Sequence, residues 1–137
     1  MSRCSKRISG PLLDRIDIFV EVPRVDYEKL SAPSNGESSA DVRRRAQAAR
    51  DIQQHRFSDT AILNNAEMSP NEVWQFCEVE DSAQSLIQTA MQQMQLSARA
   101  YHRILKVSRT IADLGGSDTI GVVHITEALQ YRPTQWV

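Results

Sequence analysis

The chain has 137 residues, a hydrophobic fraction of 41%, a charged fraction of 24% and a formal net charge of −1, which are ordinary values for one soluble globular domain. A nearly neutral chain has no overall attraction to nucleic acid or membranes, so an anion site would have to come from local clusters of basic residues. No apolar run is long enough to cross a bilayer and the first residues lack the apolar core of a signal peptide, so we expect a cytoplasmic protein. The two cysteines, Cys4 and Cys77, form no C-x-x-C motif, and with only three histidines the sequence predicts no metal site.

The first predicted element is a β-strand over residues 16–22. Branched apolar residues occupy every second position there, and Pro23 ends the pattern. Asp14 and Arg15 stand immediately before it. A single strand cannot satisfy its own backbone hydrogen bonds, and no second strong strand pattern follows. We therefore expect the sequence to be a piece of a longer protein.

Residues 31–39 are rich in turn-forming residues and predict a linker or mobile loop. Ser38 or Ser39 can cap a helix that runs to about Arg56. Its apolar residues would form a narrow stripe of Val42, Ala46, Ala49 and Ile52. Arginines dominate the rest of this helix, at Arg43, Arg44, Arg45, Arg50 and Arg56.

Three or four further helices follow a connection over residues 57–68. The capping box of residues 69–72 predicts a short helix with Trp74 and Phe76 at core positions. Residues 81–84 repeat this device ahead of an apolar stripe that runs from residue 83 to 94. Ser97 can cap the next helix, which Gly115 and Gly116 end, and a last helix begins near residue 122 and stops before Pro133. The predicted fold is mainly α, one strand followed by four or five helices.

Several arginines allow two interpretations from the residues alone. Arg99 lies in the first turn of its helix, where it either extends into solvent or meets a polyanion together with the helix terminus. Arg15 either forms a surface ion pair with Asp14 or projects towards the nucleotide of an adjacent subunit, where such an arginine changes phosphoryl-transfer rates by about 10³–10⁵ in other NTPases. The arginines of residues 43–56 either contact DNA phosphates or form a solvated face that Asp41 and Asp51 partly neutralise.

None of the five glycines is followed by Lys, so the G-x-x-x-x-G-K-[ST] phosphate loop is absent. Four segments, residues 8–17, 65–70, 96–114 and 128–132, nevertheless resemble the C-terminal part of magnesium-chelatase-like AAA+ ATPases, in particular the ComM/YifB subgroup. The segments occur in the family's order and spacing. Together they extend over residues 8–132.

The resemblance implies three parts: residues 1–30 as the end of the α/β ATPase core, 31–39 as a linker and 40–137 as a helical lid domain. Arg15 then resembles the arginine finger that acts in trans, and Arg99 resembles the sensor-2 residue of the lid. The possible DNA-binding residues are Arg43, Arg44, Arg45 and Arg50.

The resemblance also implies a homo-oligomeric ring that uses ATP and Mg²⁺, held by an upstream core, and that acts on DNA in recombination or natural transformation. The expected partners are this core, neighbouring subunits and possibly DNA, but no membrane. Without a phosphate loop we expect the fragment alone to be inactive and to hold no cofactor. Two alternatives are the motor subunit of a true magnesium chelatase and a freestanding helical adaptor for DNA or protein.

Overall fold

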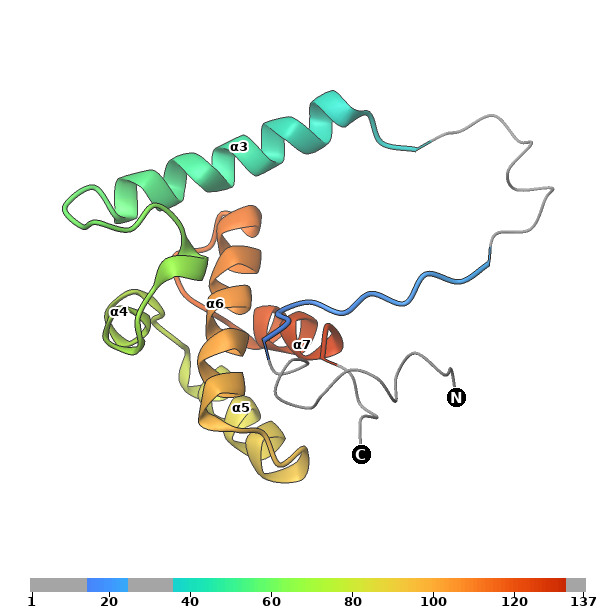
Figure 1. Cartoon of the computed structure of the whole chain (residues 1–137), viewed down its shortest axis with the longest axis vertical. Helices are drawn as coiled ribbons and strands as arrows, with labels where there is room; N and C mark the ends of the chain where they lie inside the picture. The colour runs from blue at the N-terminus through green and yellow to red at the C-terminus, as the bar shows by residue number, and fades with distance from the viewer. Residues whose placement is uncertain (1–14, 25–35, 133–137) are drawn as a thin grey trace.

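The computed structural model describes residues 15–24 and 36–132 (Figure 1). Five α-helices and one 3₁₀-helix follow one another in this part of the chain: α3 (Ser39–Arg56), η2 (Asn65–Glu67), α4 (Pro70–Phe76), α5 (Asp81–Gln93), α6 (Ala98–Gly115) and α7 (Val122–Gln130). The prediction of a mainly helical fold is confirmed. None of these helices is long and apolar enough to cross a membrane. Cys4, Asp14 and most of the predicted linker lie outside the described residues, and the three predicted parts stay a prediction.

Side-chain caps start three of the helices, as the sequence predicts. The hydroxyl of Ser38 accepts a hydrogen bond from the backbone N–H of Asp41 at the start of α3, and Ser97 does the same for Ala100 at the start of α6. Ser69 and Glu72 form the predicted capping box of α4. The predicted cap of α5 is wrong, because Asp81 is already helical and Glu80, which precedes it, makes no side-chain capping bond.

α6 is the central helix of the bundle. It contacts η2, α3, α4 and α7, and α3 crosses near its C-terminal end (Figure 1). The core around it contains apolar side chains from every α-helix that follows α3, together with residues of the connections: Phe57, Met68, Val73, Cys77, Ala83, Ile87, Ile104, Leu105, Ile120, Ile125 and Ala128. Burial of this apolar surface is the main force that holds the helices together.

The structure corrects predicted core positions on two helices, α3 and α4. On α3 only Ala49 of the predicted stripe is buried, whereas Val42 is 47% exposed. The reason is that only the C-terminal half of α3 packs on the bundle, while its N-terminal half projects beyond α6 (Figure 1). Trp74 is 73% exposed, because the short helix α4 turns Val73 inward and leaves the next side chain outside.

The predicted strand over residues 16–22 is not formed, and this prediction is corrected too. Residues 15–24 contain no strand. One backbone–backbone hydrogen bond, from the Phe19 N–H to the Tyr131 carbonyl at 3.0 Å, attaches this segment to the end of α7. A strand needs a neighbouring strand for its backbone, and the described residues provide none at this place. Its apolar side chains stay exposed, Val20 by 67%.

Candidate functional site

A pocket of about 300 Å³ brings together the two arginines that the sequence singles out. It lies between the N-terminal half of α6, the start of α4 and the turn that carries Arg15. The residues that line it are Arg15, Met68, Pro70, Arg99, His102, Arg103 and Lys106. Four of these side chains are cationic and none is acidic, so the described wall of this pocket suits an anion with several oxygens.

The basic residues of the pocket share one face of α6. Arg103 follows Arg99 by four residues and Lys106 follows Arg103 by three, which places all three side chains along one side of a helix. The helix start adds further positive potential, because its first backbone N–H groups have no intrahelical partners. Of these three residues on α6, the sequence analysis singled out Arg99 alone. The helical spacing of Arg103 and Lys106 was the signal that could have found them.

Two of these cations are already held by the protein. The Lys106 Nζ donates to the Ala66 carbonyl at 2.9 Å. The Arg103 Nη1 donates to Asp17 Oδ1 at 2.5 Å and also to the carbonyl of Arg15. Arg15 and Arg99 are exposed at the pocket, so their guanidinium groups are accessible to a ligand.

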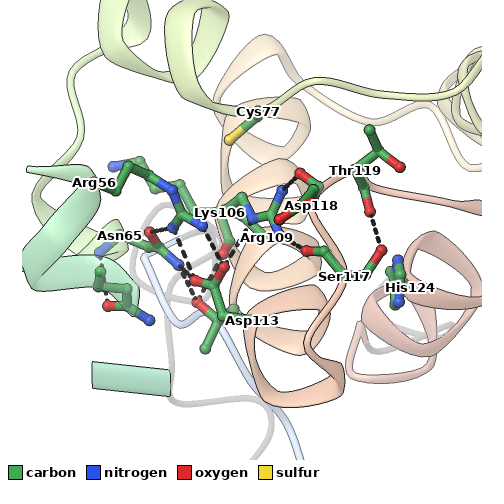
Figure 2. A network of polar contacts seen from close by, with 12 residues as sticks. Arg56, Asn65, Cys77, Lys106, Arg109, Asp113, Ser117, Asp118, Thr119 and His124 are labelled. Atoms are coloured by element: carbon green, nitrogen blue, oxygen red, sulfur yellow. Dashed lines mark hydrogen bonds and ion pairs between the residues drawn. The ribbon is translucent and has the colours of Figure 1, made fainter. Parts of the chain in front are cut away.

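A buried polar network fixes the other end of α6 (Figure 2). The Asp113 carboxylate accepts hydrogen bonds from Asn65 at 2.8 Å, from Arg56 at 2.9 Å and from the Arg109 Nε at 3.0 Å. The rest of the Arg109 guanidinium donates to the carbonyls of Ser117 and Asp118. This network joins the end of α3, the η2 turn and the loop after α6, so it sets the position of the helix that carries the basic pocket. Sequence reasoning missed it.

Two buried side chains, Asp113 and Cys77, have shifted pKa values. Burial of the Asp113 carboxyl disfavours its charge, but the hydrogen bonds from Arg56 and Asn65 and the charges of Arg56 and Arg109 outweigh that effect, so the pKa of Asp113 lies below its ordinary value. Burial raises the pKa of the Cys77 thiol to about 11, which keeps it protonated and poorly reactive at neutral pH.

In the part of the chain that the structure describes, no three His, Cys, Asp or Glu residues could hold a metal together.

The arginines of α3 lie apart from the basic pocket. Arg43 and Arg50 are exposed, and Arg44 and Arg45 form exposed ion pairs with Asp41 at 2.9 Å and Glu37 at 2.8 Å. Arg56 belongs to the buried network instead. The structure therefore separates two basic regions, a pocket on α6 and the exposed arginines of α3.

Comparison with known proteins gives family matches over most of the chain. The family model for the C-terminal part of magnesium chelatase subunit ChlI matches residues 36–132, and the model for subunit ChlI matches residues 1–30. The chain is 42% identical over 131 residues to competence protein ComM of Haemophilus influenzae and 40% identical over 131 residues to YifB of Escherichia coli.

These alignments cover 95% of this chain but 25% of each relative, so the chain spans about a quarter of their length. A YifB protein of Salmonella typhimurium is 37% identical over the same extent. Because the family match extends over most of the residues, the chain belongs to the magnesium chelatase subunit ChlI family.

Proposed function

We propose that this chain is the lid and arginine-finger part of a ring-forming AAA+ ATPase. The observation that carries the proposal is the pocket in which Arg15 and Arg99 meet, lined by Arg103 and Lys106 and by no carboxylate among the described residues. The triphosphate of ATP is the ligand whose charge and oxygen count match such a cluster. Family membership favours the same ligand.

In this proposal the chain supplies charge, and another part of the protein grips the nucleotide. No phosphate loop is present in the sequence, and the lining of the pocket contains no acidic ligand for Mg²⁺ in its described part. Arg15 would neutralise the negative charge that develops as the terminal phosphoryl group is transferred, and Arg99 would report nucleotide state to α6. Since both side chains line one pocket, one triphosphate would contact both of them.

In the proposed ring, a neighbouring subunit holds that nucleotide. An arginine finger acts in trans when the adjacent subunit holds the triphosphate, and ATP hydrolysis then requires two subunits to meet. The chain spans about a quarter of the length of its relatives. We therefore propose ATP hydrolysis, ring assembly and the use of Mg²⁺ for the whole protein.

The substrate that we propose for the ring is DNA taken up in natural transformation. One relative is named as a competence protein, and the projecting half of α3 presents exposed arginines outside the bundle. Such a helix can approach the phosphates of DNA without rearrangement of the core.

Titration of the chain with inorganic triphosphate, followed by NMR, tests the proposed pocket. We expect weak binding that does not need Mg²⁺, with the largest shifts in the first half of α6. Arg99→Gln and Arg15→Gln should each weaken binding by about threefold, the effect of losing roughly 0.6 kcal/mol from one exposed ionic contact. Arg50→Gln on α3 is the matched control and should leave affinity unchanged. Shifts confined to α3 would contradict the assignment.

A further inference from the structure

Arg103 differs from the other cations of the pocket in what it contacts. Its guanidinium is bound to the carboxylate of Asp17 and to the backbone carbonyl of Arg15, and its side chain is 22% exposed. Both acceptors belong to the turn that carries the arginine finger. Arg103 therefore joins α6 to the backbone of the residue whose side chain enters the pocket.

Among the described residues, few other hydrogen bonds attach this turn to the bundle. The next attachments along the described segment are the backbone bond from Phe19 to Tyr131 and a long hydrogen bond, 3.5 Å, from the Arg132 Nη1 to the Ile16 carbonyl. The side chains of residues 15–18 are exposed. A segment with so few buried contacts depends strongly on each polar bond for its order.

We propose that Arg103 is a positioning residue that clasps the Arg15 turn to α6 through Asp17, so that the finger and the bundle move together. This rests on the proposed role of Arg15. The Asp17–Arg103 pair would couple lid movement to finger placement, since the turn can follow α6 only while the clasp is closed.

A different assignment of Arg103 makes the opposite prediction. If Arg103 were a direct phosphate ligand, Asp17 would compete with the ligand for its guanidinium. Neutralising Asp17 would then release Arg103 and tighten phosphate binding. If Arg103 acts through Arg15, neutralising Asp17 loosens the turn and weakens phosphate binding. The sign of the Asp17→Asn effect therefore separates the two roles.

The clasp itself is tested on the chain without any nucleotide, by backbone ¹⁵N relaxation of residues 15–19. We expect order parameters near those of α6, about 0.85, in the unaltered protein and below about 0.6 in Arg103→Gln, with a smaller loss in Asp17→Asn. Asp41→Asn is the matched control, because it breaks an exposed Asp–Arg pair on α3 with the same chemical change. An unchanged turn in Arg103→Gln would overturn the proposal.

The functional consequence is tested with inorganic triphosphate as the probe. We expect Arg103→Gln and Asp17→Asn to weaken binding by no more than Arg15→Gln does, about threefold, and the double variant Arg15→Gln/Asp17→Asn to match Arg15→Gln alone. The positioning role would be overturned if the double variant lost affinity by the product of the Arg15→Gln and Asp17→Asn effects. Tighter binding by Asp17→Asn would overturn it too. Absence of triphosphate binding by the unaltered chain would remove the proposed function instead, and the relaxation experiment would still decide whether the clasp exists.

Discussion

Arg109 is 1% exposed and forms an ion pair with the buried carboxylate of Asp113, so the bundle holds an ion pair where water cannot solvate it. Such a pair is tolerated only when hydrogen bonds satisfy both partners. Arg56, Asn65 and two loop carbonyls complete the set here. Loss of one partner leaves an uncompensated buried charge, at a cost of about 3–5 kcal/mol, which is large against the roughly 5–15 kcal/mol of a whole domain.

At the residue scale we predict that Asp113→Asn lowers the free energy of unfolding by about 3 kcal/mol or more, because the buried guanidinium of Arg109 and the partly buried guanidinium of Arg56 lose their shared carboxylate. Urea unfolding monitored by circular dichroism measures this change. Asp118→Asn is the matched control, since only the backbone carbonyl of Asp118 takes part in the network. Equal stability losses in the two variants would contradict the argument.

The lowered pKa of Asp113 also determines how the stability difference between the unaltered protein and Asp113→Asn changes with pH. A carboxyl with a depressed pKa stabilises the fold above its ordinary value of about 4 and loses that contribution as the pH falls through the lowered pKa. The stability gap between the unaltered protein and Asp113→Asn should therefore narrow in acid. A gap that widens below pH 4 would mean that the sign is wrong.

At the scale of the element, α6 carries the whole basic face between two local signals. Ser97 caps its start beside the pocket, and Gly116 ends it with φ at +69°, a conformation that side-chain-bearing residues adopt with difficulty. Gly115, one residue earlier, is still helical, and a Cβ there would meet only His124 Nε2, at 4.0 Å. Two adjacent glycines thus have different conformational requirements.

We predict opposite effects of alanine at these two glycines. Gly116→Ala should destabilise the protein by about 1 kcal/mol, because nothing clashes but the left-handed backbone is strained. Gly115→Ala should stabilise it by about 0.5–1 kcal/mol, because alanine reduces the entropy that the unfolded chain loses on forming the helix. Urea midpoints of the two variants measured side by side test this pair, and shifts of the same sign would refute it.

At the scale of the whole molecule, the two basic regions lie on different parts of the bundle. The pocket is built around α6, whereas the arginines of α3 lie on a helix that is anchored at one end by Arg56 and projects at the other (Figure 1). A nearly neutral chain can therefore present concentrated positive charge at two places. A nucleotide and a nucleic acid would not compete for the same side chains.

For the proposed DNA surface, we predict that the chain binds short duplex DNA weakly and with a steep salt dependence. Arg43→Gln/Arg50→Gln should reduce the slope of log affinity against log salt by about 2, because each lost phosphate contact removes about 0.9. Fluorescence anisotropy over a range of salt concentrations measures the slope. Gln54→Ala, an uncharged change on the same helix, is the control, and a slope that stays constant in the arginine variant would exclude α3 as the DNA surface.

Much of the helical layout could be predicted because its signals are local. A cap such as Ser69 acts on an N–H group three residues away, so the start of α4 follows from four adjacent residues. Burial is a property of the assembled fold. Periodicity alone could not show that half of α3 projects from the bundle, nor that Trp74 lies outside it.

The sequence by itself determined most of the helix boundaries and the family resemblance, and it singled out Arg15 and Arg99, since these depend on residue types and their order along the chain. Only the tertiary structure decided that Arg15, Arg99, Arg103 and Lys106 surround one pocket. It also decided that residues 16–22 form no strand and that Arg109 is buried with Asp113. The physical reason is that these features arise from contacts between segments far apart in the chain, whose approach is set by packing around α6.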